Sequence, residues 1–245
     1  MRVLAALLLL LLAGCGDSAA LDRLAPMGRG RVVEVVSSDL VMLDDGKAVK
    51  LAGLAYMPRE EPYAAQATAE LQKLVLGQEV ELLSGGAAQD PFGRRVAHLR
   101  TVKGRRWIEG EMLEAGAARV RTFPDNRALA KEMLEREAKA RVAKRGLWAL
   151  PYYEVRLPSE VRFAHGFAIV EGRVTAVRRF GRGYSLDVEG LTADIPASAA
   201  PDFDAAGKAP SSLAGKVIRI RGTIRGGPSM RLDHPEAVEV LTTAP

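Results

Sequence analysis

Side chains that often bind metals or act as nucleophiles are scarce in this chain. It has one cysteine and three histidines among 245 residues, and His98, His165 and His234 are scattered along it. One cysteine excludes an intramolecular disulfide framework, and these residues are too few for a structural zinc site. They also form no visible catalytic histidine constellation. Any metal ion would therefore have to bind to carboxylates.

The single cysteine lies at the end of an apolar N-terminal segment. Arg2 precedes an apolar run over residues 3–13, and the letters LAGC follow, with Cys15 as the last. The run is too short to span a bilayer and is typical of a secretory signal. LAGC resembles a bacterial lipobox, which implies cleavage after residue 14 and acylation of Cys15. An ordinary secretory signal is the alternative.

This N-terminal pattern predicts where the chain is located. We expect a signal peptide at 1–14, a leader at 15–27, and a lipid at Cys15 that anchors the chain to a bacterial membrane. The folded part would then lie in the cell envelope, in the periplasm or outside the cell.

Arginines alternate along the short apolar runs of the second half of the chain. On a barrel, arginines beside aromatic rings would suit a groove that binds nucleic acid. Arginines on exposed strand faces serve solubility equally well, so both interpretations stay open. The candidates for binding are Arg173, Arg219, Arg221 and Tyr184. A net charge of +5 suits an acidic partner without requiring one.

The composition predicts many short elements rather than long helices. Hydrophobic residues make up 48% and charged residues 27%, which excludes a disordered or fibrous chain, while 24 glycines and 13 prolines indicate frequent turns. From residue 28 to 123 the pattern is mostly that of strands, with a hairpin signal, DDG, at 44–46. Apolar spacing predicts helices near 63–76, 108–115 and 126–144. Charges of both signs along 131–145 predict a solvent-exposed face on the last helix.

Two prolines, Pro151 and Pro158, indicate a boundary between two blocks. Beyond it, short alternating runs bounded by glycine or proline predict a small barrel, and residues 201–212 predict a loop or one short helix. These runs resemble bacterial OB-fold domains. We therefore expect a mainly β fold with some helices, with domains at 28–150 and 163–241 joined by a linker at 151–162.

Five segments of the first block, taken in order, resemble the thermonuclease, or staphylococcal-nuclease-like, family over residues 28–148. They are GRV at 30–32, VKLAGL at 49–54, DPFGRR at 90–95, MLEAGAARV at 112–120 and EAKARVAKRGLW at 137–148. The resemblance implies a five-stranded barrel capped by helices, and hydrolysis of DNA and RNA phosphodiesters with Ca²⁺. In that family two aspartates hold the metal, a glutamate helps to activate water, and two arginines bind the phosphate.

The residues that the resemblance carries over are incomplete. The first metal aspartate falls on Asp39 and the second on Ala55, while the first arginine falls on Lys50 and the second on Arg94. Lys50 keeps the charge but not the two-pronged contact of an arginine. Each retained residue also has a structural explanation: Asp39 in a turn, Arg94 in a loop and Lys50 on an ordinary strand face.

The family's glutamate falls on Pro58, or on Arg59 if one residue is inserted, and Glu60 and Glu61 are nearby but out of register. Without the second aspartate and this glutamate, Ca²⁺ should bind weakly and hydrolysis should be slow.

Two functions remain open. The residues favour an envelope lipoprotein whose degenerate thermonuclease-like domain binds nucleic acid or a protein without cleaving it. The alternative is a calcium-dependent nuclease with an altered active site. The identity of a protein partner does not follow from the sequence.

Overall fold

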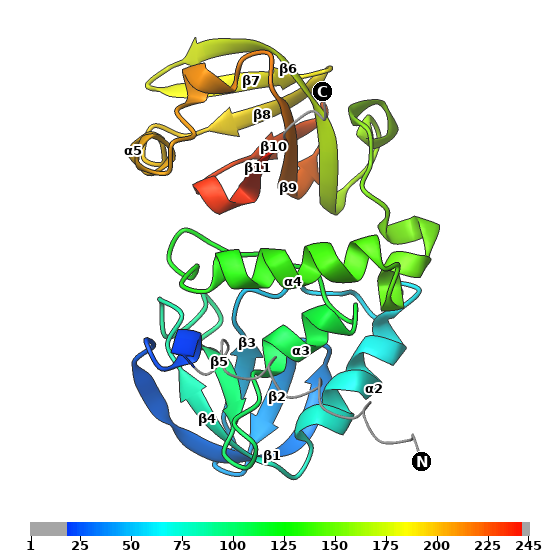
Figure 1. The fold of residues 1–245 in the computed structure, drawn as a ribbon, viewed down its shortest axis with the longest axis vertical. Coiled ribbons are helices and arrows are strands. Elements are labelled where there is room, and N and C mark those ends of the chain that lie inside the picture. The colour runs from blue at the N-terminus through cyan, green and yellow to red at the C-terminus, as the bar shows by residue number, and fades with distance from the viewer. Residues whose placement is uncertain (1–18, 242–245) are drawn as a thin grey trace, which may run out of the picture.

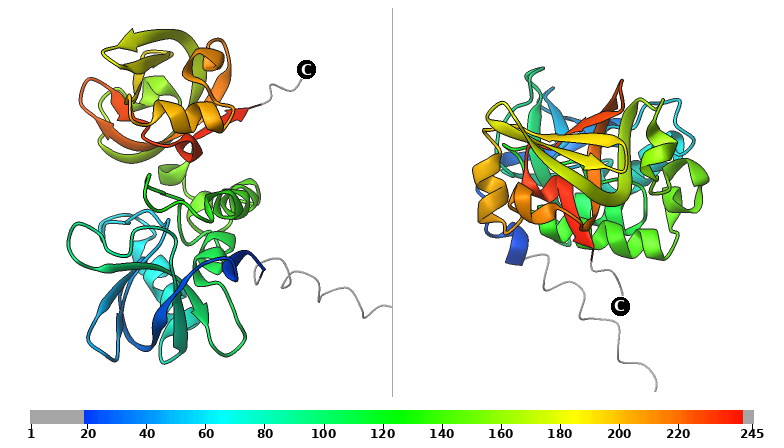
Figure 2. Two further views of the ribbon diagram at one scale, coloured as in Figure 1. Left: turned by 90° about the vertical axis from the view of Figure 1, so that its left-hand side faces the viewer. Right: turned by 90° about the horizontal axis from the view of Figure 1, so that it is seen from above.

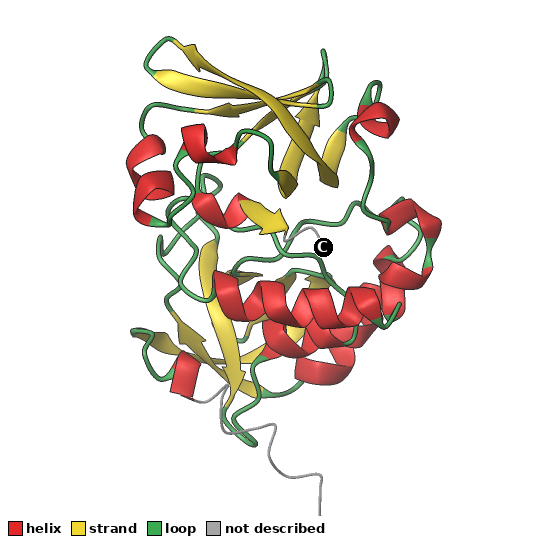
Figure 3. Cartoon of the chain, turned by 45° about the horizontal axis from the view of Figure 1, so that its top comes forward, coloured by secondary structure: helices red, strands yellow, loops and turns green. Residues whose placement is uncertain are grey.

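A computed structural model describes residues 19–241, so Cys15 and the predicted signal peptide lie outside the described residues. The described chain forms two β-rich units, with one helix, α4, lying between them (Figures 1 and 2). Figure 3 shows the strands in two main groups on either side of the helices of the first unit. Within residues 19–241 no helix has the length and apolar character needed to cross a membrane.

The first unit is a closed five-stranded barrel in the order β1-β2-β3-β5-β4. Its strands are β1 (Pro26–Ser37), β2 (Leu40–Leu43), β3 (Ala48–Leu51), β4 (Glu79–Leu83) and β5 (Arg95–Thr101). All pairings are antiparallel except that of β3 with β5. Alternate side chains such as Val32, Val41 and Val49 are fully buried, and each contributes roughly 1.5–3 kcal/mol. The predicted barrel is confirmed, and Gly46 takes the positive φ that the DDG turn requires.

Three of the described α-helices accompany this barrel: α2 (Ala64–Val75), α3 (Ile108–Glu114) and α4 (Ala130–Val142). They confirm the three helices that apolar spacing predicts. The prediction of a solvent-exposed charged face on the last helix is wrong at Glu137, which is fully buried together with Met133 and Ala140. These three positions lie on one stripe of the helix, and Glu137 is paired with a residue of the second unit.

The second unit repeats the strand pairing of the first. It contains β6 (Gly166–Phe180), β7 (Gly183–Val188), β8 (Leu191–Ile195), β9 (Val217–Arg225), β10 (Ser229–Arg231) and β11 (Val238–Leu241). Strands β6, β7 and β8 form a meander, β10 runs parallel to β8, and β10 also pairs with β9, which pairs with β6. This ring has the order of an OB-like barrel, and β11 extends it beside β9.

A short helix occupies the same place in each unit, between the third and fourth strands: α2 in the first and α5 (Ala200–Ala205) in the second. The segment 201–212, predicted to be a loop or one short helix, holds most of α5, a turn and the start of a 3-10 helix at Pro210–Leu213. Each unit has its own hydrophobic core. Among the described strands none of one barrel pairs with a strand of the other. The limits of the linker at 151–162 stay a prediction.

Candidate functional site

The first barrel has a pocket of about 360 Å³ beside β3 and the turn that leads into β5. Lys50 and Arg94 are the two cationic residues of its lining, and Leu54, Phe92 and Phe123 are among the apolar ones. The phenyl rings are unusually open for such large side chains, since Phe92 is 82% and Phe123 is 41% exposed. Asp90 and Asp125 line it as well, so the pocket combines charges of both signs with accessible aromatic faces.

Asp39 lies in the tight connection between β1 and β2, where its side chain is almost completely buried. One carboxylate oxygen accepts a hydrogen bond from the ammonium of Lys50, and the other accepts one from Oγ of Ser37 at 2.8 Å. The register of β2 with β3 places Leu40 opposite Lys50, which brings the two charges together. Both oxygens of Asp39 are thus engaged by the protein itself.

Arg94 is held by the turn that precedes β5. Its Nε donates to Oδ2 of Asp90 at 2.7 Å, and Oδ1 of Asp90 accepts the backbone N–H groups of Phe92 and Arg94. Burial opposes ionisation of Asp90, but these hydrogen bonds outweigh it and lower the pKa of the carboxyl. The guanidinium of Arg94 lies 5.1 Å from the centroid of the Phe92 ring. Arg94 thus has the turn-stabilising role that the sequence left open, and it still lines the pocket.

The carboxylates near the two missing family positions are not directed to Asp39. Ala55 is buried, and its N–H donates to the carbonyl of Arg119 at 2.8 Å. Glu61 pairs with Nη2 of Arg119 at 2.9 Å, and that guanidinium in turn lies 4.9 Å from the ring centroid of Tyr153. Neither position therefore adds an oxygen ligand next to Asp39.

These residues do not fit a bound Ca²⁺. A calcium ion takes several oxygen ligands, most often including more than one carboxylate. Here the ammonium of Lys50 already lies against the Asp39 carboxylate. Among residues 19–241 there is no group of three or more histidine, cysteine, aspartate or glutamate side chains suited to a metal ion.

The structure does not gather the candidate binding residues of the second barrel into one groove. Arg173 is exposed and donates to the carbonyl of Gly215 at 2.7 Å. Tyr184 is half-buried, with the Arg179 guanidinium 4.7 Å from its ring centroid. Arg219 lies between Glu171 and Glu239, with N···O distances of 2.9 and 3.3 Å.

Among the four candidate binding residues, Arg221 is the one whose environment differs most from the exposed strand face that the sequence suggested. Its side chain is 3% exposed, and it pairs with Glu137 of α4 at 2.8 Å and with Glu239 of β11 at 2.6 Å. Burial opposes its charged form, but the two carboxylates outweigh this and raise the pKa of Arg221. It is a buried contact between the two units, because α4 covers this face of β9.

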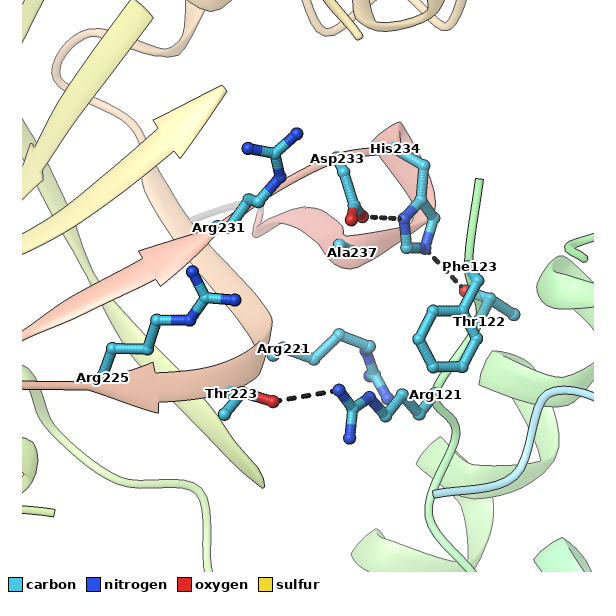
Figure 4. A pocket seen from close by; sticks show the side chains of 11 residues that line it. Arg121, Thr122, Phe123, Arg221, Thr223, Arg225, Arg231, Asp233, His234 and Ala237 are labelled. Atoms are coloured by element: carbon cyan, nitrogen blue, oxygen red, sulfur yellow. Dashed lines mark hydrogen bonds and ion pairs between the residues drawn. The ribbon is translucent and has the colours of Figure 1, made fainter. Parts of the chain in front are cut away.

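A second basic site, which the sequence did not reveal, lies in the cleft where the units meet (Figure 4). Arg121 and Phe123 come to it from irregular chain that follows β5 and α3, and Arg225 and Arg231 come from β9 and β10. No spacing in the sequence links these residues, since about a hundred positions separate the two pairs. Only the packing of the units brings them together.

A comparison with protein-family models finds a match in the part of the chain that forms the first barrel. The model of the family described as staphylococcal nuclease homologue matches residues 40–150. A comparison with curated protein sequences gives no match. The matched segment runs from β2 to just beyond Ala149 and contains the pocket residues of the first barrel. Residues 40–150 are therefore similar to that family.

Proposed function

From this similarity we propose that the chain is a nucleic-acid-binding protein whose nuclease-like pocket binds single strands without cleaving them. The observation that carries the proposal is the ion pair between Lys50 and Asp39. It places a resident cation on the carboxylate that corresponds to a metal ligand. The ion pair occupies the carboxylate that a calcium ion needs, and it leaves the Lys50 ammonium, which also lines the pocket, as a hydrogen-bond donor for a phosphate.

Binding is supported by the other side chains of the pocket. Single-stranded nucleic acids are held by cations that contact the backbone and by aromatic rings that stack on bases. Lys50 and Arg94, each of which also pairs with a carboxylate of the first barrel, supply the first kind of group, and the exposed rings of Phe92 and Phe123 supply the second. These interactions need no metal ion.

Hydrolysis lacks a group to activate water. A positioned general base contributes about 10²–10⁴-fold in rate, and the family position for it is Pro58 in this chain, or Arg59 if one residue is inserted. Glu61 is engaged by Arg119, and no ion pair or hydrogen bond ties the exposed Glu60 to the described residues of the pocket. The alternative function, a calcium-dependent nuclease, would need one of these glutamates to move.

The proposal also covers where in the cell the protein is located. We propose that Cys15 carries a lipid and holds both barrels in the cell envelope. The support is the LAGC segment and the apolar run before it. The nucleic acid met there would be external to the cytoplasm.

The test measures binding and cleavage in parallel on the purified chain. A fluorescein-labelled single-stranded oligonucleotide reports binding by anisotropy, and heat-denatured DNA with and without Ca²⁺ reports cleavage on gels. We expect salt-sensitive binding that weakens in Lys50→Gln and Arg94→Ala, and no cleavage above the level of the Arg94→Ala protein.

A gain-of-function variant sharpens the test. The triple variant Lys50→Arg, Ala55→Asp and Pro58→Glu restores the phosphate-binding arginine, the second metal-binding aspartate and the glutamate that helps to activate water. We expect it to gain some calcium-dependent cleavage. Cleavage by the unmodified chain that requires Ca²⁺ and disappears in Asp39→Ala would overturn the non-catalytic assignment. Absence of oligonucleotide binding by the unmodified chain would overturn nucleic-acid binding.

A further inference from the structure

The cleft between the two barrels is a basic site that is separate from the first-barrel pocket. Its volume is about 90 Å³, the space of roughly three liquid waters, which suits a group the size of a phosphate. Figure 4 shows Arg225 and Arg231 on the side of the second barrel, and Arg121 and Phe123 on the side of the first.

Contacts between the units fix the walls of this cleft. Nη2 of Arg121 donates to Oγ1 of Thr223 at 3.0 Å, and Oγ1 of Thr122 shares a hydrogen bond of 2.8 Å with Nε2 of His234. Thr122 and His234 are both buried. The site is therefore held by groups from both barrels and exists only when they are packed together.

Positive charge in the cleft exceeds the negative charge that faces it. Four arginines and one carboxylate, Asp233, line the cleft. Arg221 is already neutralised by its two glutamate partners. In the part of the chain that the structure describes, Arg121, Arg225 and Arg231 have no carboxylate within salt-bridge distance. Three guanidinium groups less one carboxylate leave an excess of two positive charges.

Asp233, which this count already includes, is hydrogen-bonded within the second barrel, since its Oδ1 is 2.8 Å from Nδ1 of His234. Arg121 is half-buried, and its close neighbours are the hydroxyl of Thr223 and the rings of Phe123 and Phe167, whose centroids are 5.2 and 5.6 Å away. Burial lowers the pKa of the Arg121 guanidinium, and the charge of Asp233 only partly offsets this. A half-buried cation without an ion-pair partner is the arrangement that a bound anion would complete.

Phe123 connects the cleft with the first-barrel pocket, since it lines both. A chain bound at Lys50 and Arg94 can therefore pass the Phe123 ring and reach the arginines of the cleft. Guanidinium groups match a phosphate with paired N–H donors.

We propose that the cleft formed by Arg121, Arg225 and Arg231 binds a backbone phosphate of the same single-stranded nucleic acid that occupies the first-barrel pocket. This inference rests on the proposed function and adds a path across both barrels, with Phe123 between the two sites. The second barrel then extends the length of strand that is bound.

The test uses the chain without its predicted signal peptide and compares two probes. One is a deoxythymidine dinucleotide, which the first-barrel pocket alone can hold, and the other is a dodecanucleotide, which reaches the cleft. The variant is Arg225→Ala with Arg231→Ala, both exposed on the second barrel. The matched control is Arg178→Ala with Arg182→Ala, which removes two exposed arginines of the same barrel from the β6–β7 hairpin.

We expect the cleft variant to bind the dodecanucleotide about tenfold more weakly, which is a loss of about 1.4 kcal/mol of binding free energy. Its affinity for the dinucleotide should be unchanged. Its salt dependence should also fall by about 0.7 in log–log slope for each phosphate that the variant no longer binds. The hairpin control should bind both probes like the unmodified chain.

Each other outcome has a definite meaning. Equally weakened binding in both double variants, or unchanged binding in both, would overturn the cleft while leaving the first-barrel pocket as the binding site. Inorganic phosphate that binds the cleft, with dodecanucleotide affinity unchanged in the variant, would also overturn it in favour of a free-anion site. If the unmodified chain binds neither probe, the proposed function fails as well.

Discussion

The buried ion pair between Arg221 and Glu137 should couple the folding of the two barrels. Nη1 of Arg221 on β9 lies 2.8 Å from Oε2 of Glu137 on α4, and both side chains are almost fully buried. Oε1 of Glu137 accepts the N–H of Val120 at 2.7 Å. We therefore choose Arg221→Met, which keeps much of the side-chain volume and removes the charge.

The magnitude follows from what the substitution leaves behind. Removing one partner of a buried pair costs about 3–5 kcal/mol, because the remaining charge is desolvated and uncompensated. Arg141 is still 3.5 Å from Oε2 of Glu137 and offsets part of this, so we expect the free energy of unfolding to fall by about 3 kcal/mol. The more exposed contacts of Arg127 with Asp202 and Glu236 should contribute below about 1 kcal/mol.

The assay is urea unfolding followed by two signals. Both tryptophans, Trp107 and Trp148, belong to the first unit, so their fluorescence reports its unfolding, while far-ultraviolet circular dichroism reports both units. The unmodified chain should give coincident transitions. Arg221→Met should be less stable, and the two signals should separate.

The control is Arg219→Met on the same strand. Arg219 pairs with Glu171 and Glu239, both in the second unit, and these carboxylates are partly exposed. We expect a cost below about 1 kcal/mol and coincident transitions. The reasoning is refuted if Arg221→Met costs no more than Arg219→Met, or if its two signals still coincide.

Two further outcomes are expected. Burial, followed by the charge of Glu61, raises the pKa of Tyr153 from 10.0 to about 12. Because the folded chain favours the neutral phenol, Tyr153 contributes its full stabilisation below pH 10, and this contribution is lost as the pH rises towards 12. One of the five tyrosines should therefore ionise late in an absorbance titration and be missing from Tyr153→Phe, and an unchanged titration would contradict this. Cys15→Ser should release the protein from bacterial membranes into the soluble fraction; equal membrane retention and the same cleavage point would exclude the lipid anchor.

The sequence by itself determined the elements of the first barrel and its similarity to the staphylococcal nuclease homologues. Alternation and the DDG turn predict the strands on either side of Gly46, and apolar spacing predicts α2, α3 and α4, because these patterns depend on neighbouring residues. The five ordered segments predicted the nuclease-like domain that the family model matches at 40–150. The absence of a second aspartate at Ala55 is likewise a property of the sequence alone.

The tertiary structure decided the partners of the charged side chains. Glu137 and Arg141 have the spacing of a solvent-exposed pair, yet Glu137 is buried because a residue 84 positions away packs onto it. In the sequence Lys50 has the pattern of an ordinary charged residue on a strand, but the β2–β3 register brings it into an ion pair with Asp39. The cleft of Arg121, Arg225 and Arg231 exists only where the two barrels meet. Local patterns report which face of an element is apolar, whereas the neutralisation or excess of a charge depends on what packs against it from distant parts of the chain.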